Sequence, residues 1–254
     1  MLLKGRELGL VADDGANRGQ LTFHFGDVRR VGEPGKAIGN LGASQGTPYY
    51  DALVRVADSV FRDPVTDQVR RRAVVALTDG VDSSSNSDFG TAKLKLSRAG
   101  IASYFIQVNT EDFVEDRLMK DCKDDGRLSL SQRQLQRYRE IFMPRAKAED
   151  FENFCQMGQF ERMSISRDLY SLARREMNDL ARVSGGRSFV ASDLSDARAA
   201  FARVAADIGT LYSLGYYPTN KNRDGKFRAI HLELRGLKEK AQIRARDGYY
   251  APRN

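Results

Sequence analysis

Two short segments carry residues whose types could hold a metal ion. Asp79 lies in Thr78-Asp79-Gly80, directly after the apolar run at residues 73–77. A carboxylate at the carboxyl end of a buried parallel strand faces the crevice where α/β sheets bind ligands, and its oxygens suit a hard cation such as Mg²⁺. Thr47 precedes a predicted helix, so its hydroxyl could bind a metal or cap that helix. Asp79 has a similar alternative, which is to cap its own loop.

Other kinds of reactive or metal site find little support in the sequence. Cys122 and Cys155 are not in a C-x-x-C pair, and His24 and His231 are the only histidines, so a zinc site would be short of closely spaced ligands. The sequence contains no convincing Ser-His-Asp or Cys-His set and no Walker-type phosphate loop. The two cysteines could form one disulfide or remain as two free thiols.

A phosphohydrolase of the haloacid-dehalogenase type is an enzymatic alternative, because such enzymes also place an Asp after an apolar strand. Their motif has two Asp with one residue between them, whereas two residues separate Asp79 from Asp82. No general acid or lysine motif accompanies the pair. The spacing therefore favours a binding domain over an enzyme.

Composition and charge are those of a globular protein. The chain has 254 residues, of which 41% are hydrophobic and 30% charged. No apolar run approaches the roughly 20 residues that span a bilayer, and no signal peptide follows Met1. The net charge is +7, and residues 221–254 contain ten basic and four acidic residues. These charges alternate with apolar residues, which favours a solvated face of a sheet over nucleic-acid binding.

Alternating apolar strands and amphipathic helices predict an α/β fold with a parallel sheet. Residues 109–167 interrupt the alternation and are too long for an ordinary loop, so we expect a helical insertion there, with one helix marked by Leu135, Tyr138 and Phe142. The predicted strands are residues 73–77, 101–108 and 188–191. Two helices are predicted at residues 51–61 and 88–99. A third is predicted from an apolar stripe of Leu169, Leu172, Ala173, Met177 and Leu180. A fourth, with Asp193 as its N-cap, is predicted from the stripe Leu194, Ala197, Phe201, Val204, Ile208 and Leu211.

The C-terminal residues show a different pattern, with a period of two. Residues 230–235 and 241–246 alternate apolar and polar side chains, which predicts an antiparallel hairpin with one face buried. Residues 215–218 are expected to end a preceding strand, and residues 222–225 to form a turn. We therefore divide the chain into a domain at residues 1–212 and a hairpin extension at residues 213–254.

Taken together, these segments resemble the von Willebrand factor A (VWA) family, in particular its bacterial members. The family binds a metal through three loops, and residues 46–53 and 76–85 are similar to the second and third. The resemblance implies that Thr47 is a direct ligand in the engaged state and that Asp79 acts mostly through water. It continues, in order, in Ser184-Gly185-Gly186-Arg187-Ser188-Phe189, Leu211-Tyr212-Ser213-Leu214-Gly215-Tyr216, Asp224-Gly225-Lys226-Phe227-Arg228 and Arg244-Ala245-Arg246-Asp247-Gly248-Tyr249.

The first metal loop of the family, Asp-x-Ser-x-Ser, does not occur before Thr47. Residues 13–17 contain a degenerate candidate without hydroxyls, but they are too close to Thr47 for the helix and strands that should intervene. We interpret Glu7–Ala12 and residues 21–25 as a hairpin of the second and third strands, with residues 15–19 at its tip. On that interpretation the first strand, its metal loop and the first helix precede Met1, and the flanking strands are left with unpaired edges that favour aggregation.

The expected fold is a doubly wound, Rossmann-like three-layer sandwich with the insertion and the hairpin extension. The expected function is binding of a protein partner whose acidic side chain completes the coordination of Mg²⁺ or Mn²⁺ at Thr47 and Asp79. With one formal charge from these two residues, metal binding by this chain should be weak. A degenerate, metal-independent interaction module is the second alternative. An extracytoplasmic location is implied by the resemblance alone.

Overall fold

The computed structural model describes residues 7–12, 22–27, 46–61, 72–120, 122, 130–210, 214–233 and 243–253. β1 (Glu7–Ala12) pairs antiparallel with β2 (Thr22–Asp27), which confirms the predicted hairpin. The predicted tip at residues 15–19 lies outside the described residues. In the described part of the chain these strands form a two-stranded sheet of their own, not one joined to the main sheet.

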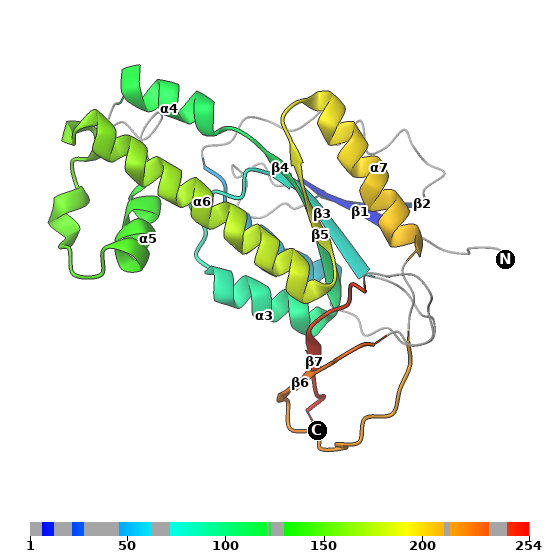
Figure 1. Ribbon diagram of the computed structural model, residues 1–254. Helices are drawn as coiled ribbons and strands as arrows, with labels where there is room; N and C mark the ends of the chain where they lie inside the picture. Colours follow the sequence, from blue (N-terminus) through cyan, green and yellow to red (C-terminus); the bar gives the residue numbers. More distant parts are fainter. Residues whose placement is uncertain are drawn as a thin grey trace.

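The main sheet has three parallel strands in the order β3-β4-β5, as the alternation of strands and helices predicts (Figure 1). They are β3 (Arg72–Thr78), β4 (Ile101–Val108) and β5 (Arg187–Ala191). Thr78 lies opposite Gln107, so the carboxyl ends of β3 and β4 meet at one edge of the sheet. The chain is thus a mixed α/β protein whose parallel strands are interleaved with helices, an arrangement compatible with a Rossmann-like fold.

One face of the sheet is covered by α2 (Tyr49–Arg55), α3 (Phe89–Ala99) and the second half of α6 (Gln159–Ser184). α3 has the predicted ends, because the Asp88 side chain accepts a hydrogen bond from the Thr91 N–H and Gly100 adopts a φ of +64°. The helix predicted at residues 51–61 is α2 continued as one π-helical segment, η1 (Val56–Val60). The buried core of this face comprises Tyr49, Tyr50, Leu53, Ala57, Ala92, Leu96, Ile101, Phe105, Met177, Leu180 and Ala181.

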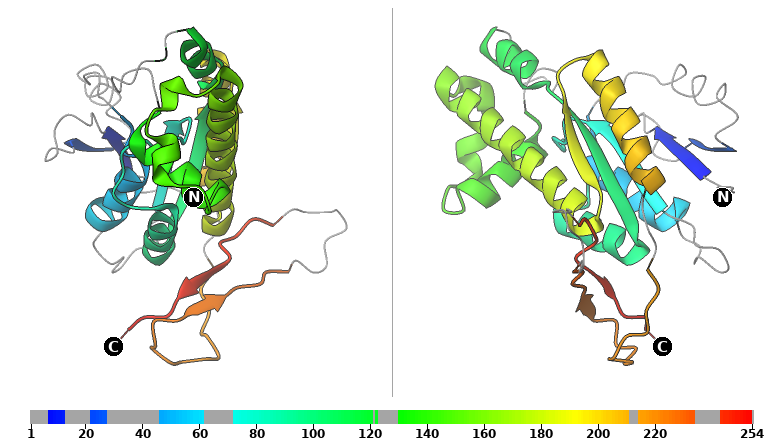
Figure 2. Two further views of the ribbon diagram at one scale, coloured as in Figure 1. Left: turned by 90° about the vertical axis from the view of Figure 1, so that its left-hand side faces the viewer. Right: turned by 45° about the vertical axis from the view of Figure 1, so that its right-hand side comes forward.

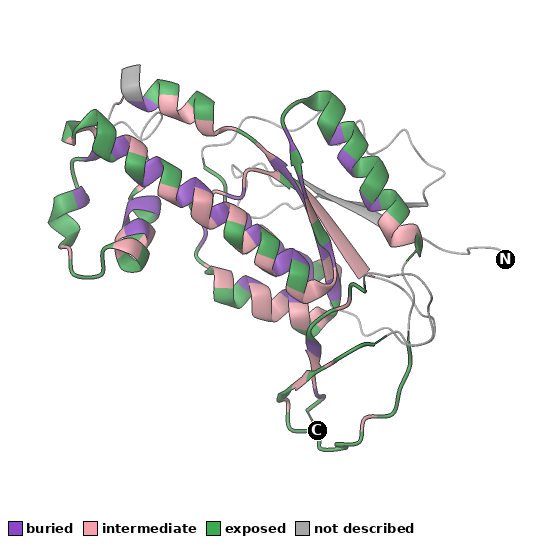
Figure 3. Cartoon of the chain, viewed as in Figure 1, coloured by how far each residue is buried: buried purple, intermediate pink, exposed green. Residues whose placement is uncertain are grey.

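The opposite face is covered by α7 (Leu194–Thr210), which gives a three-layer arrangement (Figures 1 and 3). The Asp193 side chain accepts from the Asp196 N–H, as expected of the predicted cap. The predicted apolar stripe of this helix is partly wrong, because Leu194 is 70% and Phe201 46% exposed. Ala197, Val204 and Ile208 of the predicted stripe do pack toward the sheet, and Ala200 joins them. The buried core of this face consists of Tyr104, Ile106, Phe189, Ala191, Ala197, Ala200 and Val204.

The predicted helical insertion is present and has a core of its own. It contains α4 (Glu111–Lys120), α5 (Gln132–Phe142) and two 3-10 turns, η2 (Ala148–Phe151) and η3 (Phe154–Gln156). Cys122 and Cys155 form a disulfide across it, which decides between the two alternatives left open by the sequence. The buried core comprises Leu118, Leu130, Leu135, Tyr138, Phe151, Phe154, Ile165 and Leu169.

α6 joins this insertion core to the sheet. The helix begins at Gln159, not after residue 167, so its first turns lie inside the predicted insertion. Ile165 and Leu169 belong to the insertion core, whereas Met177 and Leu180 pack under the sheet. A single 26-residue helix therefore supports both parts. No described helix is both long enough and apolar enough to cross a bilayer.

The C-terminal extension is a narrow ribbon that projects away from the sheet (Figure 2). β6 (Phe227–Ala229) pairs antiparallel with β7 (Gly248–Tyr250). The predicted antiparallel pairing is therefore present, but it lies outside the predicted segments, before residue 230 and after residue 246. Residues 230–233 and 243–247 are not strands, and Leu232 and Ile243 are 38% and 37% exposed, which contradicts the predicted buried face. Residues 214–218 contain no strand, which contradicts the strand end predicted there, and Tyr217 is 99% exposed.

Candidate functional site

The two loops predicted to bind metal lie against one another. The Ser83 N–H donates to the Thr47 carbonyl at 3.1 Å, and the Thr47 N–H donates to Ser83 Oγ at 2.6 Å. Asp79 follows β3 directly, and Gly80, at a φ of +75°, turns the chain toward Ser83. The structure therefore brings the Thr47 segment and the Asp79 segment together at the carboxyl end of β3.

Two further carboxylates bind these loops together. Asp82, which is 6% exposed, accepts hydrogen bonds from the Tyr50 N–H at 3.1 Å and from the N–H and hydroxyl of Ser85. Asp51 accepts from the N–H groups of Asn86 and Ser87, both at 2.8 Å. Each loop thus contributes a carboxylate that accepts hydrogen bonds from backbone N–H groups. Asp51, in the Thr47 segment, binds the Asp79 segment, and Asp82 binds N–H groups of both segments. The buried Asp82 carboxylate therefore links the backbone of the two segments.

Asp51 should be a measurable contributor to folding stability. Burial opposes ionisation, but the hydrogen bonds from Asn86 and Ser87 outweigh it and hold the pKa of Asp51 below its usual value. We expect Asp51→Ala to lower the free energy of unfolding by about 2 kcal/mol at pH 7, because charge-assisted hydrogen bonds are lost. Urea denaturation of the two proteins measures this difference.

The stabilisation by Asp51 should depend on pH and should exceed that of an exposed aspartate. Because the folded pKa of Asp51 is depressed, its stabilisation is fully present above the ordinary Asp pKa of about 4 and is lost as pH falls through the folded pKa. The difference between wild type and Asp51→Ala should therefore shrink below about pH 4. The control Asp58→Ala removes an exposed ion pair with Lys95 and should cost under about 1 kcal/mol. Equal losses for both variants would contradict the proposed locking role.

Asp79 is held from two sides. Its Oδ1 accepts from the Val81 N–H at 3.1 Å, within its own turn, and its Oδ2 accepts from the Thr110 hydroxyl at 2.6 Å. The Thr110 Oγ1 also lies 2.8 Å from the Tyr170 hydroxyl. Neither Thr110 nor Tyr170 was singled out from the sequence, because they lie 31 and 91 positions beyond Asp79 and belong to no recognisable motif.

Thr47 is exposed and its hydroxyl makes no hydrogen bond to any described residue. The N-cap of α2 is Pro48, and no side chain caps that helix. The structure thus gives no support to the alternative in which Thr47 is a helix cap. Its hydroxyl stays available to solvent or to a ligand.

The donors at this site fit Mg²⁺ in kind but not in number. Hydroxyl and carboxylate oxygens are the ligands that Mg²⁺ prefers, and the ion requires near-octahedral coordination. Among the described residues, no group of three or more His, Cys, Asp or Glu side chains could hold a metal. Thr47 and Asp79 would therefore leave most coordination positions to water or to a partner.

The insertion borders the same loops. The Ser131 hydroxyl, at the N-cap of α5, donates to the Ser83 carbonyl at 2.7 Å, and Arg133 Nη2 donates to the Asn86 carbonyl at 3.0 Å. One turn later, α5 is anchored to the core beneath the Thr47 segment. Arg137 Nη2 lies 2.6 Å from both oxygens of Glu176, and the Tyr50 hydroxyl donates to Glu176 at 2.5 Å. Sequence reasoning gave no indication of this contact between insertion and site.

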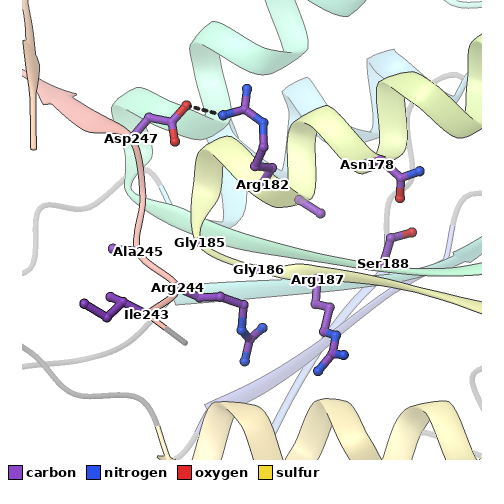
Figure 4. A pocket seen from close by; sticks show the side chains of 11 residues that line it. Asn178, Arg182, Gly185, Gly186, Arg187, Ser188, Ile243, Arg244, Ala245 and Asp247 are labelled. Atoms are coloured by element: carbon purple, nitrogen blue, oxygen red, sulfur yellow. Dashed lines mark hydrogen bonds and ion pairs between the residues drawn. The ribbon is translucent and has the colours of Figure 1, made fainter. Parts of the chain in front are cut away.

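A separate hollow of about 520 Å³ lies at the opposite edge of the sheet, where β5 begins (Figure 4). It is lined by Gly185 and Gly186 and by three arginines. Arg182 is paired with Asp179 and Asp247, and Arg244 with Asp207, so the protein itself neutralises much of this positive charge. We therefore place the candidate site at the loops of Thr47 and Asp79.

Comparisons of the chain with protein family models, with curated proteins and with solved structures gave no match.

Proposed function

We propose that this chain is a VWA-type interaction domain that binds a protein partner through a divalent cation at Thr47 and Asp79. The observation that carries the proposal is the pair of hydrogen bonds between Thr47 and Ser83, which holds the two loops together at the carboxyl end of β3. In open α/β sheets ligands bind at this end of the strands. The available donors are oxygens, as Mg²⁺ or Mn²⁺ requires.

A partner would bind the cation at the coordination positions that this chain does not fill. The ion, when bound, supplies positive charge and vacant coordination positions. The exposed Thr47 hydroxyl would contact it directly, and Asp79, whose oxygens already accept two hydrogen bonds, would act through a metal-bound water. A carboxylate of the partner would then complete the coordination sphere. The Cys122–Cys155 disulfide supports an extracytoplasmic location, because disulfides persist in oxidising compartments.

A metal-independent interaction module is the second candidate. It is favoured because no group of three or more His, Cys, Asp or Glu that could hold a metal occurs among the described residues, and because both Asp79 oxygens accept hydrogen bonds from the protein. The two candidates differ in one measurable property, which is binding of a divalent cation.

Titration of Mn²⁺ into the chain, followed by electron paramagnetic resonance of the free ion, tests the proposal. We expect weak binding, with a dissociation constant on the order of 1 mM, because the site offers one carboxylate. Asp79→Asn removes that charge, and Thr47→Ala the hydroxyl; each should weaken binding at least about tenfold, in the range seen when groups around a metal are lost. Acetate, as the simplest carboxylate, should displace a Mn²⁺-bound water and lower the water-proton relaxation rate.

The matched control is Asp193→Asn. Asp193 also follows a strand of the sheet, but its side chain accepts a hydrogen bond from the Asp196 N–H and caps α7. This variant should bind Mn²⁺ as the wild type does. Absence of Mn²⁺ binding by the folded wild-type chain at tens of millimolar would leave the metal-independent module as the better account.

A further inference from the structure

A chain of two hydrogen bonds ends on the Asp79 carboxylate. Thr110 Oγ1 lies 2.6 Å from Asp79 Oδ2 and 2.8 Å from the Tyr170 hydroxyl. The three residues come from three different elements: Asp79 follows β3, Thr110 lies between β4 and α4, and Tyr170 is in α6. These hydrogen bonds therefore connect the candidate metal site to the residue before α4, at the start of the insertion, and to the helix that supports both cores.

The direction of these hydrogen bonds follows from proton counting. An ionised carboxylate only accepts, so the hydroxyl of Thr110 must donate to Asp79. That hydroxyl has a single proton, so in the contact with Tyr170 it can only accept. The order is therefore Tyr170 to Thr110 to Asp79, with each hydroxyl donating toward the site. Successive bonds of this kind polarise one another, which strengthens the bond to the carboxylate.

Tyr170 occupies a position where its hydroxyl needs a partner. The residue is 5% exposed, and a buried phenol without a hydrogen bond is costly. Burial raises the pKa of Tyr170 to about 12, so the phenol keeps its proton at neutral pH and remains a donor. A phenylalanine would fill the same space without that requirement. Tyr170 thus supplies a hydrogen bond in addition to packing, and the Thr110 hydroxyl accepts it.

The other oxygen of Asp79 is fixed independently. Its Oδ1 accepts from the Val81 N–H at 3.1 Å, so the carboxylate is held at both oxygens and its plane cannot rotate freely. Each carboxylate oxygen can accept about two hydrogen bonds, which leaves one acceptor direction on each oxygen for a metal-bound water.

We propose that Thr110 and Tyr170 are positioning residues that orient the Asp79 carboxylate toward the water shell of the bound cation. The inference rests on the proposed function, because it assigns a task to residues around the same site. Neither residue contacts the cation itself. They act through Asp79, in the way that hydrogen-bonded neighbours orient metal ligands in other sites.

Three substitutions test the arrangement by Mn²⁺ titration. Thr110→Val keeps the shape and removes the hydroxyl, and it should raise the Mn²⁺ dissociation constant about tenfold. Thr110→Ser keeps the hydroxyl and should bind nearly as tightly as the wild type. Tyr170→Phe leaves the Thr110–Asp79 bond in place but removes the donor behind it, so we expect a smaller loss, about threefold. Thermal unfolding of each variant separates loss of affinity from loss of fold.

Matched controls remove the same groups elsewhere. Thr210→Val deletes a hydroxyl that bonds only to the backbone of α7, and Tyr138→Phe deletes a phenol that contacts Asp168 in the region of the insertion core. Both should leave Mn²⁺ affinity unchanged. A folded Thr110→Val that binds Mn²⁺ as tightly as the wild type would overturn the inference, as would a Thr110→Ser that binds no better than Thr110→Val.

A second measurement keeps the inference separate from the proposed function. The carboxyl carbon of Asp79, followed by carbon-13 resonance without any metal, should shift in Thr110→Val and return in Thr110→Ser. If the wild type binds no Mn²⁺, the proposed function fails. The orientation of Asp79 by Thr110 and Tyr170 then stands if this resonance moves as expected, and it falls if the resonance is the same in all variants.

Discussion

Gly186→Ala is expected to destabilise the chain by at least about 3 kcal/mol, the upper end of the range for overpacked interiors. A Cβ at this position would lie 1.9 Å from the Ser103 carbonyl oxygen, 2.6 Å from its carbonyl carbon and 2.9 Å from its nitrogen. All three are backbone atoms of β4, the central strand, so no side-chain rotation can relieve the clash. Urea denaturation followed by circular dichroism would measure the loss.

The close approach has a structural reason. α6 ends at Ser184, Gly185 reverses the chain at a φ of +78°, and β5 must then start pairing with β4 at once. Gly186 occupies the single position between the turn and the strand, and its N–H donates to the Ala181 carbonyl at 2.9 Å. The backbone of β5 therefore enters the sheet directly beside Ser103, and only hydrogen fits on that side of Gly186.

The control is Gly215→Ala. An added Cβ there meets nothing within 4 Å, and its φ is not in the left-handed region, so its effect should stay within about 0.5 kcal/mol. Comparable losses for the two variants would mean that the destabilisation by Gly186→Ala does not come from the contact with β4.

The parallel sheet could be predicted from the sequence because its signal is local. Apolar runs covered on both faces read as strands whatever the rest of the chain does, and residues 101–108 form a strand with the predicted bounds. The start of α6 could not be predicted in this way. Its first turns bury Ile165 and Leu169 against the insertion, whereas its later turns bury Met177 against the sheet, so two different surfaces decide one helix.

Periodicity also shows which side chains could be buried but not which of them are covered. In α7 the sheet accepts Ala197, Ala200 and Val204, while the larger Phe201 remains 46% exposed. In the C-terminal ribbon the alternation of apolar and polar residues is present, but Leu232 remains 38% exposed. Such outcomes depend on the distance between elements, which no single segment of sequence encodes.

The candidate site also contains residues that could be predicted from the sequence and residues that could not. Thr47 and Asp79 were found from their loops, because each lies next to a predicted strand or helix. The residues that hold these loops are bonded across 31 to 60 positions of sequence, as in the contacts of Thr110 with Asp79 and Tyr170. Asp51 gave a partial signal, since it is a carboxylate in the first turn of a helix that faces a serine run, and such carboxylates often accept backbone hydrogen bonds.

Replacing both Cys122 and Cys155 by serine is expected to destabilise the insertion by about 3–4 kcal/mol, the value for a cross-link that closes a loop of this length. The two cysteines are separated by 33 positions, and the loop between them includes α5. The core under this loop is small, so it has little other stabilisation to replace the cross-link. Native-state hydrogen exchange should show α5 amides exchanging faster, with those of β4 little changed.

Reduction of the wild type with dithiothreitol is the matched comparison, since it breaks the same bond without changing a residue, and it should reproduce the exchange pattern of the double variant. Unchanged protection of α5 in both would show that the insertion core is sufficient by itself. Because Ser131 and Arg133 bind the backbone at Ser83 and Asn86, an unfolded insertion would also release two contacts to the candidate site. The disulfide should therefore influence the loop beside Asp79 through α5, and exchange at residues 83–87 is where that influence should be measured.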